Sequence, residues 1–275
     1  MTKPTNSTRP LTRSNQRIWH APAGSRTATG SRETSPSWSG VVVTSAAGNG
    51  ITQVSGRWTV PNVNPSLSGA FSCSIWVGID GYGDAPYELL QAGIRIDVNN
   101  GKVVDIQPWW EWFPDGEQPI KGMTVSVGDE IQCSITRLSS NTAHIVLSKP
   151  KTGEVAKIPN PVKARKGILL TGNYAEWVVE APIENNVQTR LCNYGQVEFS
   201  GCSANDSNGM PLDPFSGAAL NLQQYGQTVS IGSSPAPGLV TCVYDAPNTS
   251  GSLPAPNAIS VRTLPAPNTI SPRAV

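Results

Sequence analysis

The chain has 275 residues, and its 20 basic and 19 acidic side chains give a formal net charge of +1 at pH 7. Charged residues make up only 14% of the chain, which gives no whole-chain argument for binding nucleic acid or an anionic membrane. No apolar run approaches the roughly 18 residues of a membrane span, and 26 Gly and 24 Pro interrupt the sequence too often for long helices.

Three regions follow from composition. Residues 1–36 are predicted to be a disordered basic arm, because six Lys or Arg residues precede the first acid, Glu33. This arm is either a solvated tail or a prosegment whose positive charge lies over an acidic groove, and it lacks an apolar stretch long enough for a secretory signal. Residues 37–245 are predicted to form a β-sandwich domain, and residues 246–275 a Pro-rich tail without a core of its own.

Alternating apolar and polar residues predict strands throughout the central region, and the fold class is therefore all-β. The Asn99-Asn100-Gly101 segment predicts a tight hairpin turn, because Asn-Gly supplies the positive φ angles that such turns need. Hairpin-linked runs of this kind favour stacked antiparallel sheets. The predicted strands cover residues 38–43, 51–60, 73–80, 87–98, 102–113, 123–127, 130–138, 143–148, 154–158 and 174–180, with weaker strands near 196–199, 219–222, 226–231 and 239–244.

Four of these strands carry polar or aromatic side chains on the face opposite their aliphatic residues. Side chains alternate between the two faces of a strand, so a sheet that buries the aliphatic faces would present the others together. The residues expected on this outer face are Trp76, Asp80, Gln91, Trp109, Glu111 and Glu176. The pattern predicts a groove with aromatic walls and a few convergent polar groups.

Two of these side chains could hydrolyse a peptide bond without a metal ion or a Ser or Cys nucleophile. The reaction needs a base that activates water and a donor for the developing oxyanion, and Glu176 and Gln91 would suffice if they faced one another. Taken alone, a Gln and a Glu that lie 85 positions apart are more often ordinary surface residues than catalysts.

The residues around Gln91 and Glu176 favour a catalytic role over that of ordinary surface residues. Four segments, Trp76-Val77-Gly78-Ile79-Asp80-Gly81, Leu90-Gln91-Ala92-Gly93, Trp110-Glu111-Trp112-Phe113-Pro114 and Ala175-Glu176-Trp177-Val178-Val179-Glu180, resemble in this order those of the glutamic peptidases, also called eqolisins. The resemblance runs from about Trp38 to Pro182. It implies an antiparallel β-sandwich of two seven-stranded sheets, similar to the concanavalin A-like jelly roll of legume lectins.

The resemblance also implies an endopeptidase that acts at acid pH on polypeptides through a Gln/Glu dyad, without a cofactor. By motif match, the catalytic residues fall on Gln91 and Glu176. Residues that line or support the substrate cleft fall on Trp76, Asp80, Trp109 and Glu111. We expect a monomer that binds neither nucleic acid nor membrane, and the family's usual secretion contrasts with the missing signal sequence.

Other interpretations remain open at this point. Asp80 could be a turn acceptor, Glu111 a rim charge and Glu180 an ordinary strand-end residue. Arg95 shares the predicted Gln91 face and would lower the pKa of carboxylates near it. The main alternative is a carbohydrate-binding or glycan-cleaving protein that uses Glu111 and Glu176 as its carboxylate pair. A binding module without catalytic activity is the third.

The five cysteines are an odd number, so at least one lacks an intrachain partner. Cys73 and Cys133 alternate with aliphatic residues and are predicted to be buried thiols. Cys192 and Cys202 could close a small disulfide loop, although sequence alone does not establish a pairing. We expect no metal site, because the chain has no Cys-x-x-Cys motif and its two His residues lie far apart.

Overall fold

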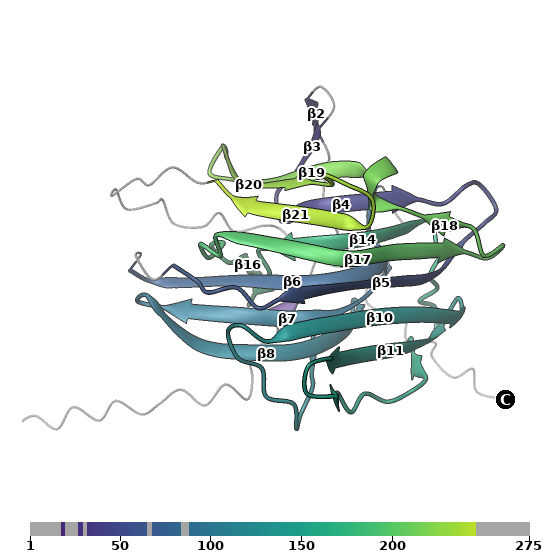
Figure 1. Cartoon of the computed structure of the whole chain (residues 1–275), viewed down its shortest axis with the longest axis horizontal. Helices are drawn as coiled ribbons and strands as arrows, with labels where there is room; N and C mark the ends of the chain where they lie inside the picture. The colour runs from purple at the N-terminus through teal and green to yellow at the C-terminus, as the bar shows by residue number, and fades with distance from the viewer. Residues whose placement is uncertain (1–17, 20–26, 30–31, 65–67, 84–87, 246–275) are drawn as a thin grey trace, which may run out of the picture.

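The computed structural model describes residues 18–19, 27–29, 32–64, 68–83 and 88–245 (Figure 1). Twenty-one strands and one short 3₁₀ helix make up this part of the chain. The strands are β1 Ile18–Trp19, β2 Thr27–Thr29, β3 Arg32–Ser35, β4 Trp38–Thr44, β5 Ile51–Thr59, β6 Ala70–Asp80, β7 Leu89–Asn99, β8 Lys102–Phe113, β9 Gln118–Pro119, β10 Glu130–Ser139, β11 Thr142–Lys149, β12 Glu154–Val155, β13 Val162–Lys163, β14 Tyr174–Glu180, β15 Ile183–Glu184, β16 Val187–Gln188, β17 Gln196–Asp206, β18 Pro211–Leu212, β19 Ala218–Gln224, β20 Gln227–Ser233 and β21 Leu239–Tyr244, and the helix η1 is Pro214–Ser216.

Hydrogen bonds join 18 of these strands into one network, and β1, β15 and β16 form a separate three-stranded sheet. The backbone of the network follows the order β9-β8-β7-β6-β14-β4-β19-β20-β21-β17-β5-β10-β11. Among the described strands, all pairs are antiparallel except β3 with β19. The predicted all-β class is therefore confirmed, while the division into two sheets of about seven strands stays a prediction.

The network folds over so that β5 packs against β6, and β10 packs against β6 and β7, without hydrogen bonds between them. In Figure 1, β5 overlaps β6 and β10 lies beside β7. The aliphatic faces predicted from alternation line the core between them. Ile75 on β6, Ala92 on β7, Trp177 on β14 and Ile135 on β10 all belong to this one buried cluster. Burial of apolar surface at about 25 cal/mol per Å² makes such a cluster the main source of stability.

Most predicted strands are found close to their expected bounds, although the strand predicted at 154–158 is only β12 Glu154–Val155 and the one near 196–199 extends to Asp206 in β17. β14 covers the predicted residues 174–180, and the predicted hairpin turn is present, with φ of 46° at Asn100 and 72° at Gly101. The strand predicted at 123–127 is wrong, because this segment lies outside every strand although Met123 and Val125 are buried. Alternating apolar residues indicate which side chains are buried. An irregular segment that packs on the core can have the same alternation as a strand.

Parts of the predicted basic arm are found in short strands. The backbone of β1 pairs with β15 and that of β3 pairs with β19, both far along the chain, while β2 pairs with its neighbour β3. The distant partners of β1 and β3 explain why local sequence did not predict these two strands. The rest of the arm and the predicted tail at 246–275 lie outside the described residues.

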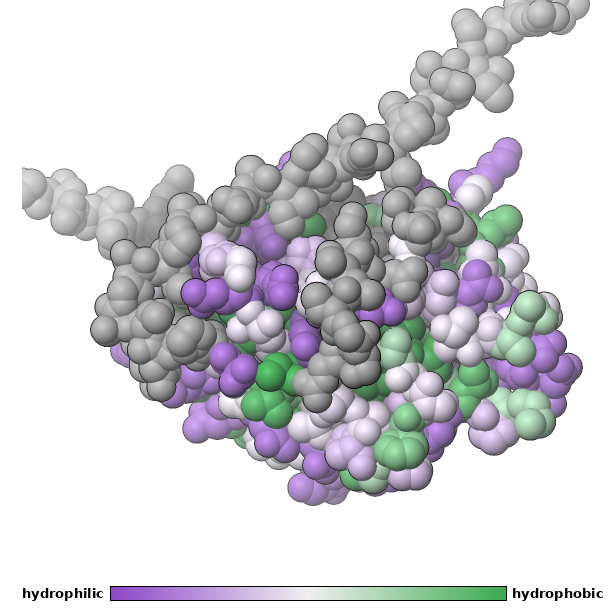
Figure 2. Space-filling view, turned by 90° about the horizontal axis from the view of Figure 1, so that it is seen from above, coloured by the Kyte–Doolittle hydropathy of each residue, from purple (hydrophilic) through white to green (hydrophobic). Residues whose placement is uncertain are grey.

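The face seen in Figure 2 shows no single large hydrophobic area among the described residues. On the side seen in Figure 2, hydrophobic residues form small separate areas among hydrophilic ones. Large exposed hydrophobic side chains lie apart in the chain, for example Val155 on β12, Met210 just before β18 and Phe215 in η1. None of the helices in the described ranges is long and apolar enough to cross a membrane. Candidate functional residues are therefore best sought among the buried polar groups.

Candidate active site

Strand register brings the predicted site residues into one row. Glu176 on β14 pairs with Gly78 on β6, Gly78 pairs with Gln91 on β7, and Gln91 pairs with Glu111 on β8. Directly opposite residues in antiparallel strands point to the same face of a sheet. Neighbouring strands lie about 4.8 Å apart, so the Cα atoms of Glu176 and Gln91 are separated by about 10 Å, with only a glycine between them.

Gly78 leaves the space that the carboxylate of Glu176 occupies. A Cβ atom at this position would lie 2.8 Å from Glu176 Oε1 and 2.8 Å from Trp76 Cζ3. The carboxylate therefore leans across the middle strand toward Gln91. The glycine is required here by the close approach of neighbouring side chains rather than by its backbone angles.

The carboxyl group of Glu176 is fully buried. Neither of its oxygens accepts a hydrogen bond from any group in the described part of the chain. Burial raises the pKa of Glu176 well above its ordinary value, and the nearby carboxyl of Asp80 raises it further. Loss of hydration is the main cause of this shift, and Arg95 pairs instead with Asp97 and Glu117. A buried carboxyl with a raised pKa is typical of a general acid or base.

Asp80 fixes the backbone that leads into β14. It accepts hydrogen bonds from the Thr171 hydroxyl at 3.0 Å and from the backbone N–H groups of Gly172, Asn173 and Tyr174 at 2.7 to 3.3 Å. Its own φ is +70°, in the region that favours glycine. Burial raises the pKa of Asp80 in spite of these hydrogen bonds. Asp80 thus positions the start of the strand that carries Glu176.

The predicted aromatic residues line the same face as the row. Trp76, Trp109 and Val178 belong to a second buried cluster, and the Trp76 ring meets the Trp38 ring edge-on with centroids 4.9 Å apart. The Trp76 indole N–H donates to Glu180 Oε2 at 2.9 Å. Glu180 is fully buried, so its interpretation as an ordinary strand-end residue is wrong. The only sequence signal that Glu180 contacts Trp76 was its position on the same strand face as Glu176.

Glu111 stands beside Gln91, and the register separates it from Glu176. Three strand spacings of about 4.8 Å lie between the backbones of the two acids, and Gln91 is in the row between them. A glycosidase carboxylate pair spans about 5 to 9.5 Å, so the register favours Glu176 with Gln91 over Glu176 with Glu111. In the described residues, no group of three or more His, Cys, Asp or Glu could hold a metal ion.

The predicted outer face is not open to solvent. The side chains of Trp76, Gln91, Glu111 and Glu176 are fully buried. Among the described segments, β3 contributes Glu33, which accepts a hydrogen bond of 2.5 Å from the Tyr82 hydroxyl next to this face. A surface hollow of about 510 Å³ lies along β5, β10 and β17, and none of its lining residues belongs to the predicted site.

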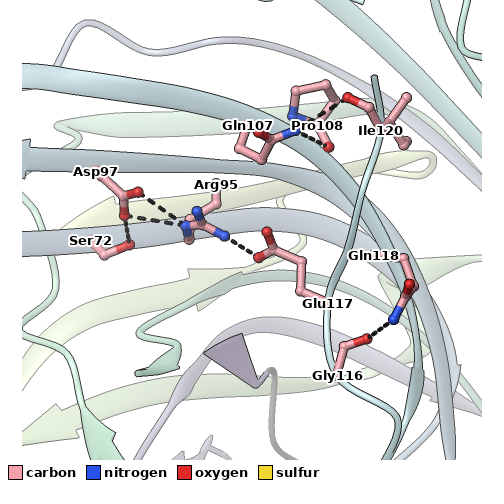
Figure 3. A network of polar contacts seen from close by, with 9 residues as sticks. All are labelled: Ser72, Arg95, Asp97, Gln107, Pro108, Gly116, Glu117, Gln118 and Ile120. Atoms are coloured by element: carbon pink, nitrogen blue, oxygen red, sulfur yellow. Dashed lines mark hydrogen bonds and ion pairs between the residues drawn. The ribbon is translucent and has the colours of Figure 1, made fainter. Parts of the chain in front are cut away.

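Arg95 lies on the Gln91 face of β7, four residues along the strand from Gln91, and binds two carboxylates (Figure 3). Its Nε donates to both carboxylate oxygens of Asp97 at 3.2 Å, and its Nη1 forms an ion pair with Glu117. Burial opposes the charge, but the two carboxylates outweigh it and raise the pKa of Arg95. Glu117 precedes β9, which pairs back onto β8 at Trp109. The ion pair therefore fastens this returning segment to the site face.

Replacing Glu117 with Gln is expected to destabilise the fold by about 3 to 5 kcal/mol, because it leaves a buried guanidinium with one carboxylate partner instead of two. The side chains of Arg95 and Glu117 are only 6% and 4% exposed. Urea unfolding measures the change. The matched control is Asp129→Asn, which breaks the more exposed pair with Lys149 and should cost less than about 1 kcal/mol. Equal small effects in both variants would show that the Arg95 pair contributes nothing special.

Sequence comparison matches the chain to a known protein family. The sequence model of the peptidase A4 family matches residues 36–244. The chain is 26% identical over 220 residues to aspergillopepsin-2 of Aspergillus niger, a match that covers 74% of this chain and 75% of the relative. It is 29% identical over 184 residues to scytalidopepsin B of Scytalidium lignicola, covering 64% and 66%.

Solved structures show the same fold. A scytalido-glutamic peptidase bound to a transition-state analogue inhibitor superposes with a TM-score of 0.64 at 24% identity, covering 76% of this chain and 98% of that structure. Aspergilloglutamic peptidase from Aspergillus niger superposes with a TM-score of 0.58 at 25% identity, covering 64% and 99%. The family match extends over most of the described residues and includes the entire row from Glu176 to Glu111. The chain therefore belongs to the peptidase A4 family, the glutamic peptidases or eqolisins.

Proposed function

We propose that the chain is an endopeptidase that hydrolyses peptide bonds at acid pH with Gln91 and Glu176 as its catalytic dyad. The observation that carries the proposal is the row in which a buried, hydrogen-bond-free carboxylate leans over Gly78 toward Gln91. A carboxylate in this state is costly to bury without partners. A water molecule and a peptide carbonyl between the two side chains would supply those partners.

In the proposed mechanism, ionised Glu176 takes a proton from water as the water oxygen attacks the scissile carbonyl. The Gln91 amide donates a hydrogen bond to the oxyanion that forms. Protonated Glu176 then gives its proton to the leaving amine, the C–N bond breaks, and the carboxylate is regenerated. The raised pKa of Glu176 makes it a stronger base when ionised and a better-matched acid in the second step.

The neighbouring residues have supporting roles in this proposal. Trp76 and Trp109 would contact the peptide, with Glu180 holding the Trp76 ring through its indole N–H. Asp80 would keep β14 in register through the backbone groups before it, and Glu111 would restrain Gln91 from the next strand. A polypeptide substrate is supported by related structures, one with a peptide-based transition-state analogue and one with the tripeptide Ala-Ile-His.

The proposal includes the finer architecture as well. We infer a concanavalin A-like sandwich whose two layers are joined at β19, since this strand pairs with β4 on one side and β20 on the other. The fold-over of the hydrogen-bonded network supports this description. A backbone superposition restricted to each layer against a legume lectin would test it.

A cleavage assay on the purified full chain tests the function. The dyad is buried in this structure, so the protein should be preincubated at each pH before a denatured protein is added. We expect new peptide fragments at acid pH, as the family resemblance implies, at a rate that rises with pH through the raised pKa of Glu176. Absence of fragments at every pH after preincubation, in protein that unfolds cooperatively, would remove the proposal.

Replacing Gly78 with Ala is expected to lower kcat/KM by about 10²-fold, since displacing a catalytic group by about 1 Å costs that much. The new methyl group would collide with the Glu176 carboxylate and the Trp76 ring. Gly122→Ala is the control, because its methyl meets no atom within 4 Å and adds backbone strain alone. Steady-state kinetics on both variants decide the matter. Full activity in Gly78→Ala would mean that the carboxylate does not need its position over β6.

A further inference from the structure

Two of the five cysteines meet in the core although they are 119 positions apart in the chain. Cys73 lies on β6, and Cys192 lies in the segment that follows β16. Their Sγ atoms are 2.7 Å apart, and both residues are buried. The sequence expectation of a small loop between Cys192 and Cys202 is not met, because Cys192 contacts Cys73.

The backbone on both sides of this contact is fixed by hydrogen bonds. Ser72 N–H donates to Arg190 C=O at 2.9 Å, and Cys192 N–H donates to Ser72 C=O at 3.2 Å, which forms a parallel bridge. The Gln224 side chain holds the same segment from the other side. It accepts from Leu191 N–H at 3.1 Å and donates to Thr189 C=O at 2.8 Å. The sulfur contact therefore results from a fixed backbone arrangement and not from a chance rotamer.

The other three cysteines have different surroundings. Cys242 donates through its thiol to the Ser39 carbonyl at 3.4 Å, and Cys133 points into the aliphatic core from β10. In the described part of the chain, the Cys73–Cys192 pair alone shows a sulfur–sulfur contact. The arrangement thus selects one pair among the ten possible pairs that five cysteines allow.

We propose that Cys73 and Cys192 form an intramolecular disulfide bond in an oxidising medium, and that the other three cysteines stay as thiols. The oxidant is a small-molecule disulfide such as oxidised glutathione. One protein thiolate attacks it and releases one small-molecule thiol, and the second protein thiolate then attacks the mixed disulfide and releases the other. The protein loses two hydrogens in total, and the small disulfide is reduced to two thiols.

Because both thiols are buried, the disulfide is expected to form during folding and not afterwards. Burial raises the pKa of Cys192 well above its ordinary value, and the neighbouring Cys73 sulfur raises it further. The thiolate is the attacking species, so the folded core hinders the reaction. Oxidation is therefore expected while the chain folds, and the closed bond is then protected from reductants. The loop that it closes runs from residue 73 to residue 192 and contains Asp80, Gln91, Glu111 and Glu176.

Peptide mapping of the full wild-type chain tests the proposal. The protein is refolded with a mixture of reduced and oxidised glutathione, denatured, alkylated and digested without reductant. Trypsin alone leaves Cys192, Cys202 and Cys242 on one peptide, because the chain has no Lys or Arg between Arg190 and Arg262. Chymotrypsin separates Cys192 from Cys202 by cutting after Tyr194 and Phe199.

The expected result is a cross-linked peptide pair carrying Cys73 and Cys192, with alkylation of Cys133, Cys202 and Cys242. Reductant added before unfolding should leave the bond intact, and reductant added after unfolding should remove it. Wild type should also melt on the order of 10 °C above a Cys73→Ala/Cys192→Ala variant. Cys133→Ala is the control that removes a buried thiol without a sulfur partner. Five alkylated cysteines after refolding, or a Cys192–Cys202 link, would overturn the assignment.

Discussion

Replacing Glu176 with Gln is expected to lower kcat/KM by about 10²- to 10⁴-fold on a denatured protein substrate, because the variant cannot take a proton from water. The substitution keeps the size and shape of the side chain, so the space over Gly78 stays filled. Steady-state kinetics at several acid pH values measure the loss. In wild type, kcat/KM should rise through a pKa above the ordinary carboxyl value, because burial disfavours the ionised form. Activity within tenfold of wild type would rule out Glu176 as the base.

The pH dependence of the unfolding free energy of Glu176→Gln shows whether the variant has lost only its catalytic base or is misfolded. The folded-state pKa of Glu176 is raised above its unfolded value, so its contribution to stability is fully present below the unfolded pKa of about 4.5. That contribution is lost as pH rises through the folded pKa, where a buried group must ionise. Gln cannot ionise. Urea unfolding should therefore give similar stability for both proteins below pH 4 and a more stable variant near pH 7.

Replacing Gln91 with Ala is expected to lower kcat by about 10²- to 10³-fold, the usual loss for one oxyanion donor. The oxyanion exists only in the transition state and the intermediate, so the effect should appear in kcat more than in KM. Glu176 remains in place in this variant. A residual rate above that of Glu176→Gln would fit a base that works without its partner.

Gln53→Ala provides the matched control for this change. Gln53 is also a strand glutamine, but it lies on β5 in the opposite layer and accepts a hydrogen bond from Asn205. Its replacement should change kcat by less than about twofold, as expected for a surface site remote from the chemistry. If Gln91→Ala and Gln53→Ala behave alike, Gln91 does not stabilise the oxyanion.

Alternation along single strands predicted much of the fold, because a half-buried strand must place its apolar residues on one side. It assigned Val77 and Trp177 to the core and Trp76 and Glu176 to the other face, as the structure shows. It could not separate a true strand from the buried irregular segment around Met123. That distinction depends on hydrogen-bond partners elsewhere in the chain.

The candidate site was predictable residue by residue but not as an arrangement. The sequence placed Gln91 and Glu176 on matching faces, yet the register that sets both opposite Gly78 is a long-range property. Burial of the site face was not foreseeable for the same reason, and it is the main cause of the raised pKa of Glu176. Glu180 was missed because a strand-end carboxylate looks alike in sequence whether it faces water or an indole N–H.

Glu176 and Gln91 stand on one hydrogen-bonded sheet and share β6 as their common neighbour. An enzyme whose reacting groups belong to two hinged halves can be switched off by swinging those halves apart. Within the strands described, no hinge lies between these two groups, and separating them would mean tearing β6 from β7 or β14. Glu176 and Gln91 would thus be in place as soon as the sheet has formed. Any control of when the pair is active would have to come from groups outside the sheet.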